Sequence, residues 1–314
     1  MFKNKCFQIP LLLLSLLSFS QQSFAEFSEL NNFGQNPGNL KATYFAPKGN
    51  KHNSHQSSLV VLLHGCAQKA EDLAQQSGLL GLAKKNDFAL LLPQQVLSNN
   101  IKYCFNWYSG DDYTKDKGET LSIKNMITTL KQKLGSEKVF IIGLSAGGAM
   151  ASSILINYPE IFTAGAVVAG IPFPCADGLI TGISCMKNGP SQTSDELLAL
   201  IRKIQPSQSQ WPNLSVWTGE KDSIVNPLNS SVLAEQWAKL SKANAKPSVI
   251  KKSDYTITHW QNNEADIKVE LVEVKNLDHG IMVNSNVENG GEVSSYLLES
   301  PLSTAKHVIE FWQL

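Results

Sequence analysis

The sequence has no excess of charge of either sign, because its 314 residues include 27 Lys and Arg and 27 Asp and Glu. Proteins that attract nucleic acids or anionic membranes through their net field usually carry a basic excess. The balance therefore argues against a nucleic acid or an anionic membrane surface as partner. The summed field of the chain is close to neutral.

Cysteine is also scarce. The chain has five cysteines, and none of them belongs to a Cys-x-x-Cys pair or lies beside a pair of histidines. Structural zinc sites are usually built from such pairs. We therefore expect neither a metal nor any other cofactor.

The N-terminus carries a short apolar run, Ile9 to Phe19, which follows two lysines and precedes a Ser-Phe-Ala sequence that ends at Ala25. This arrangement is typical of a secretory signal peptide with a small-x-small cleavage site, and the run is too short to span a bilayer. Residues 1–25 are therefore predicted to be a cleaved signal peptide. The mature chain, 26–314, is predicted to be secreted or periplasmic, with no stable membrane anchor.

Export would bring the four cysteines of the mature chain into an oxidising compartment, where they can form disulfides. Four cysteines allow three pairings. We favour Cys175 with Cys185, because these two close a short loop rich in Pro and Gly, and we pair Cys66 with Cys104.

Apolar strands alternate with helices along the mature chain. The predicted strands are 57–65, 88–93, 139–142, 164–170, 214–219 and 269–274, and the predicted helices are 70–86, 121–134, 149–156, 229–240 and 303–314. Nearly continuous apolar strands of this kind are typical of a parallel sheet that helices cover on both faces. The predicted fold is therefore α/β, with a mostly parallel central sheet in a single catalytic domain.

One segment departs from this alternation. Residues 171–211 have the composition of a loop around one helix. Long irregular segments of this kind are often functional. We expect this segment to form a lid or a pocket wall.

The sequence Gly143-Leu144-Ser145-Ala146-Gly147 lies where a predicted strand meets a predicted helix. In this context G-x-S-x-G is typical of a nucleophile elbow, a strained turn that exposes the serine hydroxyl at the top of the sheet. The following helix directs the positive end of its dipole at the same point. Ser145 is therefore the candidate nucleophile.

A serine nucleophile needs a histidine that accepts its proton and a carboxylate that orients the histidine. In a fold of this class the acid and then the histidine follow the serine in the chain. Asp222 lies just past the strand at 214–219, and His279 lies just past the strand at 269–274. We therefore expect Asp222 and His279 to complete a triad with Ser145.

Other acids and histidines of the chain could in principle take the roles of Asp222 and His279. Glu220 is an alternative acid, although it lies closer to the strand end than Asp222. Asp278 adjoins His279, and sequence neighbours usually point apart, so we expect it to be a loop carboxylate. The remaining histidines are expected to be solvated loop or surface-helix residues: His52, His55, His259 and His307.

The reaction also needs two N–H donors for the developing oxyanion. The backbone N–H of Ala146, next to the candidate nucleophile, is expected to be one of them. The sequence after the strand at 57–65 offers the backbone N–H of Cys66 as the other. His64 precedes it, and we expect this histidine to shape the loop and border the substrate pocket, with a second catalytic base as the alternative.

The segments LLHGCAQKAEDLA, CFNWY, GLSAGGAMASSILINYPEIFTAGAVVAG, VWTGEKDSIVNP and DHG occur in this order along the chain. With them, the sequence from about Leu59 to Leu314 resembles the polyhydroxybutyrate depolymerase and feruloyl esterase-like family of α/β-hydrolases. The resemblance implies an α/β-hydrolase fold and hydrolysis of carboxylic esters. It implies the same three candidate residues, and an oxyanion hole near Cys66 and Ala146.

The CFNWY segment departs from the pattern of this family, which more usually has tryptophan at the position of Phe105. We expect Phe105 to keep an aromatic wall of a different shape. Trp107 and Tyr108 are predicted to line the acyl or alcohol pocket, and core packing is the alternative for both.

Together these features predict a secreted serine esterase that works through an acyl-enzyme. The expected substrate is a polyhydroxybutyrate-type polyester or its oligomers. One alternative is a feruloyl or acetylxylan esterase that acts on plant polysaccharide, since one fold serves many substrates. An alternative of another class is a non-catalytic binding protein that retains the hydrolase fold.

Overall fold

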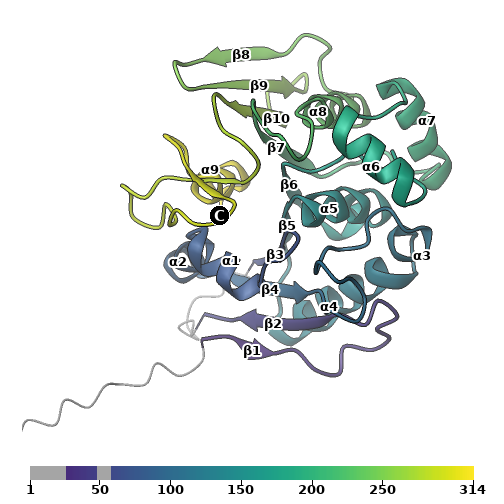
Figure 1. Cartoon of the computed structure of the whole chain (residues 1–314), viewed down its shortest axis with the longest axis vertical. Helices are drawn as coiled ribbons and strands as arrows, with labels where there is room; N and C mark the ends of the chain where they lie inside the picture. The colour runs from purple at the N-terminus through teal and green to yellow at the C-terminus, as the bar shows by residue number, and fades with distance from the viewer. Residues whose placement is uncertain (1–25, 48–57) are drawn as a thin grey trace, which may run out of the picture.

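The structure is a computed structural model that describes residues 26–47 and 58–314. The predicted signal peptide and two of the histidines considered above, His52 and His55, lie outside these residues. Within them, ten strands form one sheet in the order β1-β2-β4-β3-β5-β6-β7-β10-β9-β8 (Figure 1). The strands of this sheet are β1 (Ser28–Glu29), β2 (Lys41–Phe45), β3 (Leu59–Leu63), β4 (Ala89–Gln94), β5 (Val139–Leu144), β6 (Ala164–Val168), β7 (Asn213–Gly219), β8 (Ser248–Lys251), β9 (Tyr255–Gln261) and β10 (Ile267–Val274). A small second sheet pairs β11 (Ile281–Val283) with β12 (Leu297–Glu299).

The six strands from β4 to β10 in the middle of the sheet are parallel, and the pairs at its two ends are antiparallel. All six parallel strands were predicted from their apolar runs. The edge strands were not predicted, because they lack such runs. The strand β8, for example, is exposed along its whole length.

Helices cover both faces of the sheet (Figure 1). They are α1 (Ala70–Gln76), α2 (Leu79–Asn86), α3 (Gly110–Tyr113), α4 (Gly118–Leu134), α5 (Ala146–Asn157), the 3₁₀ turn η1 (Pro159–Ile161), α6 (Leu179–Asn188), α7 (Ser194–Ile204), α8 (Leu228–Leu240) and α9 (Thr304–Trp312). One face packs against α1, α2 and α9, and the other packs against α4, α5, α7 and α8. The sheet is therefore buried between two apolar cores, as the α/β prediction requires. None of the helices in the described part of the chain has the length and hydrophobicity needed to cross a bilayer.

Two helix predictions need correction. The helix predicted for 70–86 is divided into α1 and α2 at Gly78, whose φ of +83° is a left-handed conformation that ends the first helix. The segment 171–211 contains two helices, α6 and α7, rather than one. A capping box begins α7, in which Thr193 Oγ1 accepts from Glu196 N and the Glu196 carboxylate accepts from Thr193 N. This Thr-x-x-Glu signal was readable in the sequence.

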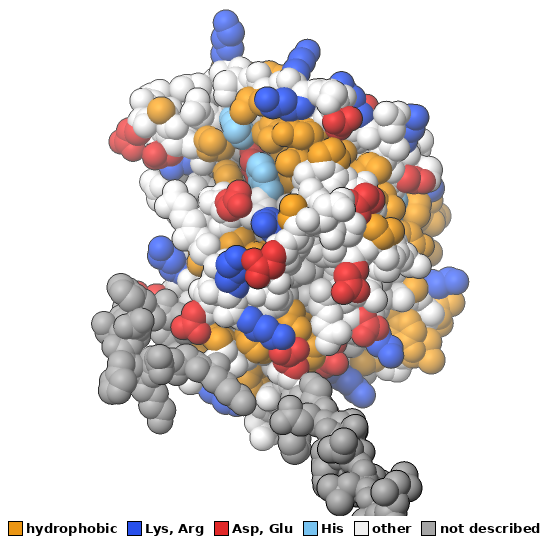
Figure 2. All heavy atoms as spheres, turned by 90° about the vertical axis from the view of Figure 1, so that its left-hand side faces the viewer, with side chains coloured by type: hydrophobic (Ala, Val, Ile, Leu, Met, Phe, Trp, Pro, Cys, Tyr) orange, Lys and Arg blue, Asp and Glu red, His pale blue; other side chains and the backbone are white. Residues whose placement is uncertain are grey.

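The face covered by α1, α2 and α9 carries interspersed positive and negative side chains (Figure 2). Near its top, histidine side chains reach the surface among apolar neighbours. His259 and His307 were expected to be solvated loop or surface-helix residues. His307 does lie on α9, but His259 lies in β9, and both side chains are partly buried and contact the carboxylate of buried Glu270. His307 Nε2 lies 3.0 Å from Glu270 Oε2, and Ser215 Oγ lies 2.5 Å from Oε1. No pattern in the sequence predicts this cluster, because its four members come from four separate elements.

The charge of this cluster changes with pH. Burial raises the pKa of Glu270, but the hydrogen bonds from His259 and His307 outweigh this effect and hold that pKa at about 2. Burial lowers the pKa of His307, but its hydrogen bond with Glu270 and the negative charge of that carboxylate raise the pKa above its usual value. A histidine that is more basic in the folded state stabilises the fold below its unfolded pKa of about 6.5. This stabilisation is lost as the pH rises through the folded pKa.

We therefore expect His307→Gln to lower the free energy of unfolding at pH 6 by about 1 kcal/mol, and by less at pH 9. Glutamine can keep a hydrogen bond to Glu270, but it carries no charge. Urea unfolding at both pH values measures the difference, and Lys306→Gln, which removes a cation from the same helix, is the control. An equal loss at pH 6 and pH 9 would show that the charge on His307 does not stabilise the fold.

Candidate active site

Ser145 lies in a sharp turn between β5 and α5. Its φ of 56° is a left-handed conformation that a residue with a side chain seldom adopts, and its N–H donates to Val168 O over 2.9 Å. The turn is possible because α5 approaches β3 very closely at Gly147. A Cβ at this position would collide with the carbonyl oxygens of Leu63 and His64. The glycine therefore allows the strained turn that exposes a serine hydroxyl.

The backbone N–H groups at the start of α5 point toward the Ser145 turn. Ala146 is the first residue of the helix, so its N–H has no acceptor within the helix. The positive end of the helix dipole adds to this field. The helix is buried along its whole length, which holds its N-terminus in a fixed position beside Ser145.

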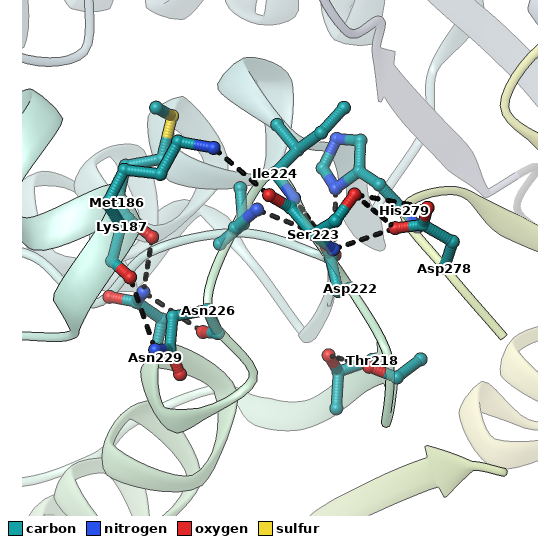
Figure 3. Close-up of polar contacts among 12 residues, drawn as sticks. Met186, Lys187, Thr218, Asp222, Ser223, Ile224, Asn226, Asn229, Asp278 and His279 are labelled. Atoms are coloured by element: carbon teal, nitrogen blue, oxygen red, sulfur yellow. Dashed lines mark hydrogen bonds and ion pairs between the residues drawn. The ribbon is translucent and has the colours of Figure 1, made fainter. Parts of the chain in front are cut away.

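Asp222 and His279 are bonded to each other. His279 Nδ1 lies 2.8 Å from Asp222 Oδ2, and both side chains are buried (Figure 3). The other oxygen, Asp222 Oδ1, accepts from the backbone N–H groups of Ile224 (2.9 Å) and Val225 (2.8 Å). These two amides fix the carboxylate in one orientation. With Nδ1 engaged by Asp222, Nε2 is the ring nitrogen of His279 that remains for another partner.

The neighbouring acids have other surroundings. Asp278 Oδ1 accepts from the backbone N–H of Ser223 (2.7 Å) and of His279 (2.8 Å), and it also contacts the Ser223 hydroxyl (Figure 3). The hydrogen bond from the Ser223 amide lowers the pKa of Asp278. Asp278 therefore joins the loops after β7 and β10 without contacting the imidazole ring. Glu220 is exposed.

The C-terminal end of α6 is bonded to the loop that carries Asp222. Asn226 N donates to Met186 O over 2.8 Å, and Lys187 Nζ donates to Ser223 O over 3.0 Å (Figure 3). The disulfide between Cys175 and Cys185, the pairing favoured from the sequence, ties α6 to the loop after β6. The segment 171–211 thus supports the candidate acid directly.

A cavity of about 230 Å³ is lined by Ser145, His279 and Trp107. Its other lining residues are Gly65, Cys66, Gln68, Leu144, Ala146, Ile171, Met186, Ile224, Val225 and Tyr296. Most of these side chains are apolar. Sequence analysis missed Gln68, Ile224, Val225 and Tyr296, and it included Ile171 and Met186 only as part of the segment 171–211 expected to form a lid or pocket wall. Gln68 was the easiest to find, because it directly follows the predicted oxyanion loop.

Two predicted pocket residues do not line this cavity. Tyr108 packs against Trp107 in an edge-to-face arrangement, with 5.6 Å between the ring centroids, and only Trp107 lines the cavity. His64 is fully buried and also lies outside the cavity. Phe105, expected to form an aromatic wall, is fully buried and packs on His64 with 4.9 Å between the centroids.

The hydrogen bonds of His64 explain its position. Its Nδ1 donates to Gly65 O over 2.7 Å, and its Nε2 accepts from Gln95 N over 3.1 Å. Burial lowers the pKa of His64 to about 4, so the ring is neutral near pH 7. Both nitrogens are engaged, which excludes the alternative of a second catalytic base. His64 shapes the loop after β3, as expected, but it does not border the pocket.

The loop after β3 is joined to the loop after β4 by the disulfide between Cys66 and Cys104, the other pairing favoured from the sequence. Ala67 N also donates to Lys102 O over 2.7 Å. Next to the loop after β4, Glu119 is fully buried, and its carboxylate accepts a hydrogen bond from Gln95 Nε2 over 2.6 Å. The loop that carries Cys66 is therefore held rigidly against its neighbour.

Residues 40–248 match a family described as esterase PHB depolymerase. The chain belongs to this family. It is 30% identical to poly(3-hydroxyalkanoate) depolymerase C of Paucimonas lemoignei, over 99% of this chain and 74% of that relative. It is 28% identical to feruloyl esterase B of Talaromyces stipitatus, over 73% of this chain and 65% of that relative. This member of the PHB depolymerase family is therefore a carboxylic ester hydrolase.

A solved structure supports the fold of this family member. The acetyl xylan esterase from Aspergillus awamori superimposes with a TM-score of 0.74, covering 91% of this chain and 98% of that one. The two sequences are 20% identical over the match. The α/β-hydrolase fold predicted from the sequence is therefore confirmed.

Proposed function

We propose that Ser145, His279 and Asp222 are the catalytic triad of a serine esterase. The observation that carries the proposal is the bonded pair of Asp222 and His279, whose imidazole lines the same cavity as Ser145. Ser145 Oγ attacks the ester carbonyl carbon while His279 Nε2 takes the hydroxyl proton, and Asp222 stabilises the imidazolium. The backbone N–H groups of Cys66 and Ala146 stabilise the oxyanion.

Collapse of the tetrahedral intermediate completes the first half of the reaction. The bond between the carbonyl carbon and the alcohol oxygen breaks, and His279 returns its proton to the leaving alcohol. Water then attacks the acyl-enzyme while His279 takes a proton from it. The bond between the carbonyl carbon and Ser145 Oγ breaks, His279 returns the proton to Oγ, and the acid is released. No metal or cofactor takes part in this scheme.

The substrate we favour is a short hydroxyacid polyester or its oligomers. Ile171, Met186 and Val225 give the cavity an apolar wall suited to short aliphatic acyl groups. The identity with the depolymerase of P. lemoignei supports the same choice. The identity with feruloyl esterase B makes an ester of plant polysaccharide the second candidate.

We also propose that residues 1–25 are a signal peptide, that residues 26–314 form one catalytic domain, and that the enzyme acts outside the cytoplasm. The two disulfides support an oxidising location. The contacts of α6 with the Asp222 loop, together with Ile171 and Met186 in the cavity, support a pocket-wall role for residues 171–211.

Product analysis separates the two substrate classes. The purified protein is incubated with amorphous polyhydroxybutyrate and, separately, with feruloylated and acetylated arabinoxylan, and the soluble products are identified by mass spectrometry. We expect hydroxybutyrate monomers and dimers from the polyester, and none from the Ser145→Ala control. Release of ferulate or acetate alone would make the enzyme a carbohydrate esterase.

A further inference from the structure

The small sheet of β11 and β12 holds an aromatic ring beside the candidate base. The strand β11 begins at Ile281, two residues after His279. The strand β12 begins at Leu297, directly after Tyr296. The two strands run parallel with Ile281 opposite Leu297, so the residues that precede them also lie side by side. The ring of Tyr296 packs against the imidazole of His279 in an edge-to-face arrangement, with 6.0 Å between the ring centroids. The reaction proposed above gives this ring no role.

The backbone of Tyr296 is held closely against the chain beside His279. Ile281 N donates to Tyr296 O over 2.8 Å. A Cβ at Gly280 would lie 2.6 Å from the same oxygen. The close approach therefore requires the glycine that follows His279, and it fixes the position from which the tyrosine ring extends.

Tyr296 also has a strained backbone conformation. Its φ of 63° lies in the left-handed region, which a bulky side chain seldom adopts. Strain of this kind persists only where the surrounding structure enforces it, and it is found often at functional sites. The ring gains little burial in return, because Tyr296 is 41% exposed. Glycine at this position would relieve the strain, so stability alone does not account for an aromatic residue here.

The ring lies where it can restrict the movement of the imidazole. The hydrogen bond from His279 Nδ1 to Asp222 Oδ2 holds the imidazole at one atom, which leaves it free to tilt about that contact. Proton transfer needs Nε2 to stay directed at Ser145, and a small displacement of a catalytic group can cost much of its effect. Tyr296 lines the same cavity as Ser145 and His279 and lies against the imidazole. Its ring can therefore limit the tilt.

We propose that Tyr296 is a positioning residue that keeps the imidazole of His279 directed at Ser145, and that the sheet of β11 and β12 holds it in place. This inference rests on the proposed function, because it takes His279 as the catalytic base. The ring acts on proton transfer and not on substrate binding. Changes at Tyr296 should therefore alter kcat more than KM.

Three variants separate the effect of the ring from that of the strained backbone. Tyr296→Ala removes the ring and keeps the strain, and we expect kcat on a soluble short-chain ester to fall about 10- to 100-fold, with KM changed less than about threefold. Tyr296→Phe keeps the ring and should recover most of this loss. Tyr296→Gly removes both the ring and the strain, so it should melt at a higher temperature than Tyr296→Ala while its kcat stays as low.

Tyr103→Ala is the matched control. Tyr103 is another exposed tyrosine with a left-handed backbone, since its φ is 54° and its exposure is 37%. It does not line the cavity that contains Ser145. The control variant loses the same side chain from a similarly strained position, and it should keep the kcat of the wild type.

A kcat in Tyr296→Ala within about threefold of the wild type would overturn the inference, as would a rise in KM with kcat retained. Recovery of kcat in Tyr296→Gly would also overturn it, because activity would then follow stability and not the ring. Failure of Tyr296→Phe to restore kcat would assign the effect to the hydroxyl group and have the same consequence.

His279→Ala is measured in parallel, to separate this inference from the proposed function. If His279→Ala has the kcat of the wild type, His279 is not the base, and the proposed function and the inference both fail. If His279→Ala is inactive while Tyr296→Ala is unimpaired, the inference alone fails.

Discussion

Replacing Ser145 by alanine is expected to lower kcat for ester hydrolysis by about 10⁴- to 10⁶-fold, because no other group can then form the acyl-enzyme. Alanine keeps the Cβ and meets the same backbone strain at a φ of 56°, so the fold should be unaffected. Initial rates on a soluble short-chain ester give the loss of activity. A thermal melt within a few degrees of the wild type shows that the fold is intact.

Labelling with a fluorophosphonate tests the same residue in another way. We expect the probe to modify the wild type at Ser145, as located by peptide mass spectrometry, and to leave Ser145→Ala unmodified. Ser191→Ala, which replaces a serine outside the cavity, is the control and should be labelled like the wild type. Full activity in Ser145→Ala would place the nucleophile elsewhere, and an unlabelled, inactive wild type would favour a binding protein with a hydrolase fold.

The second large effect is expected from Asp222→Asn, which should lower kcat by about 10⁴-fold. The amides of Ile224 and Val225 hold Oδ1 of Asp222, so an asparagine would keep its oxygen there and turn its NH₂ group toward His279 Nδ1. The imidazole would then carry its proton on Nε2, where it cannot accept one from Ser145. Rates on the soluble ester measure the loss.

Two neighbouring acids provide controls for this experiment. Glu220→Gln should leave the rate unchanged, because Glu220 is exposed and the carboxylate bonded to the ring of His279 is that of Asp222. Asp278→Asn should cost less than about tenfold, since Asp278 contacts the backbone of His279 and not its ring. Activity retained in Asp222→Asn but lost in either control would move the role of the acid to that residue.

The sequence predicted the centre of the fold better than its edges. The parallel strands are buried on both faces and therefore have nearly continuous apolar runs. Edge strands such as β8 face solvent, and their short or mixed sequences have no continuous apolar run that would predict a strand. The candidate triad could be predicted for a related reason. Asp222 and His279 follow buried strands, and parallel strands bring their carboxyl ends to one edge of the sheet.

Side-chain direction was harder to predict than position along the chain. His64 follows the buried strand β3, but its ring turns inward to Gly65 O and Gln95 N. Tyr108 is next to Trp107, yet only Trp107 lines the cavity beside Ser145.

The segment between β7 and β10 can change in length without separating Asp222 from His279. After Asp222 the chain runs through α8 to the far edge of the sheet, forms β8 and β9, and returns as β10 beside β7. Asp222 and His279 are 57 residues apart in sequence, yet they extend from adjacent paired strands. An insertion or deletion in the turn between β8 and β9 would change the length of this excursion without separating the acid from the base. Relatives can therefore differ widely in this stretch and still keep the pair together.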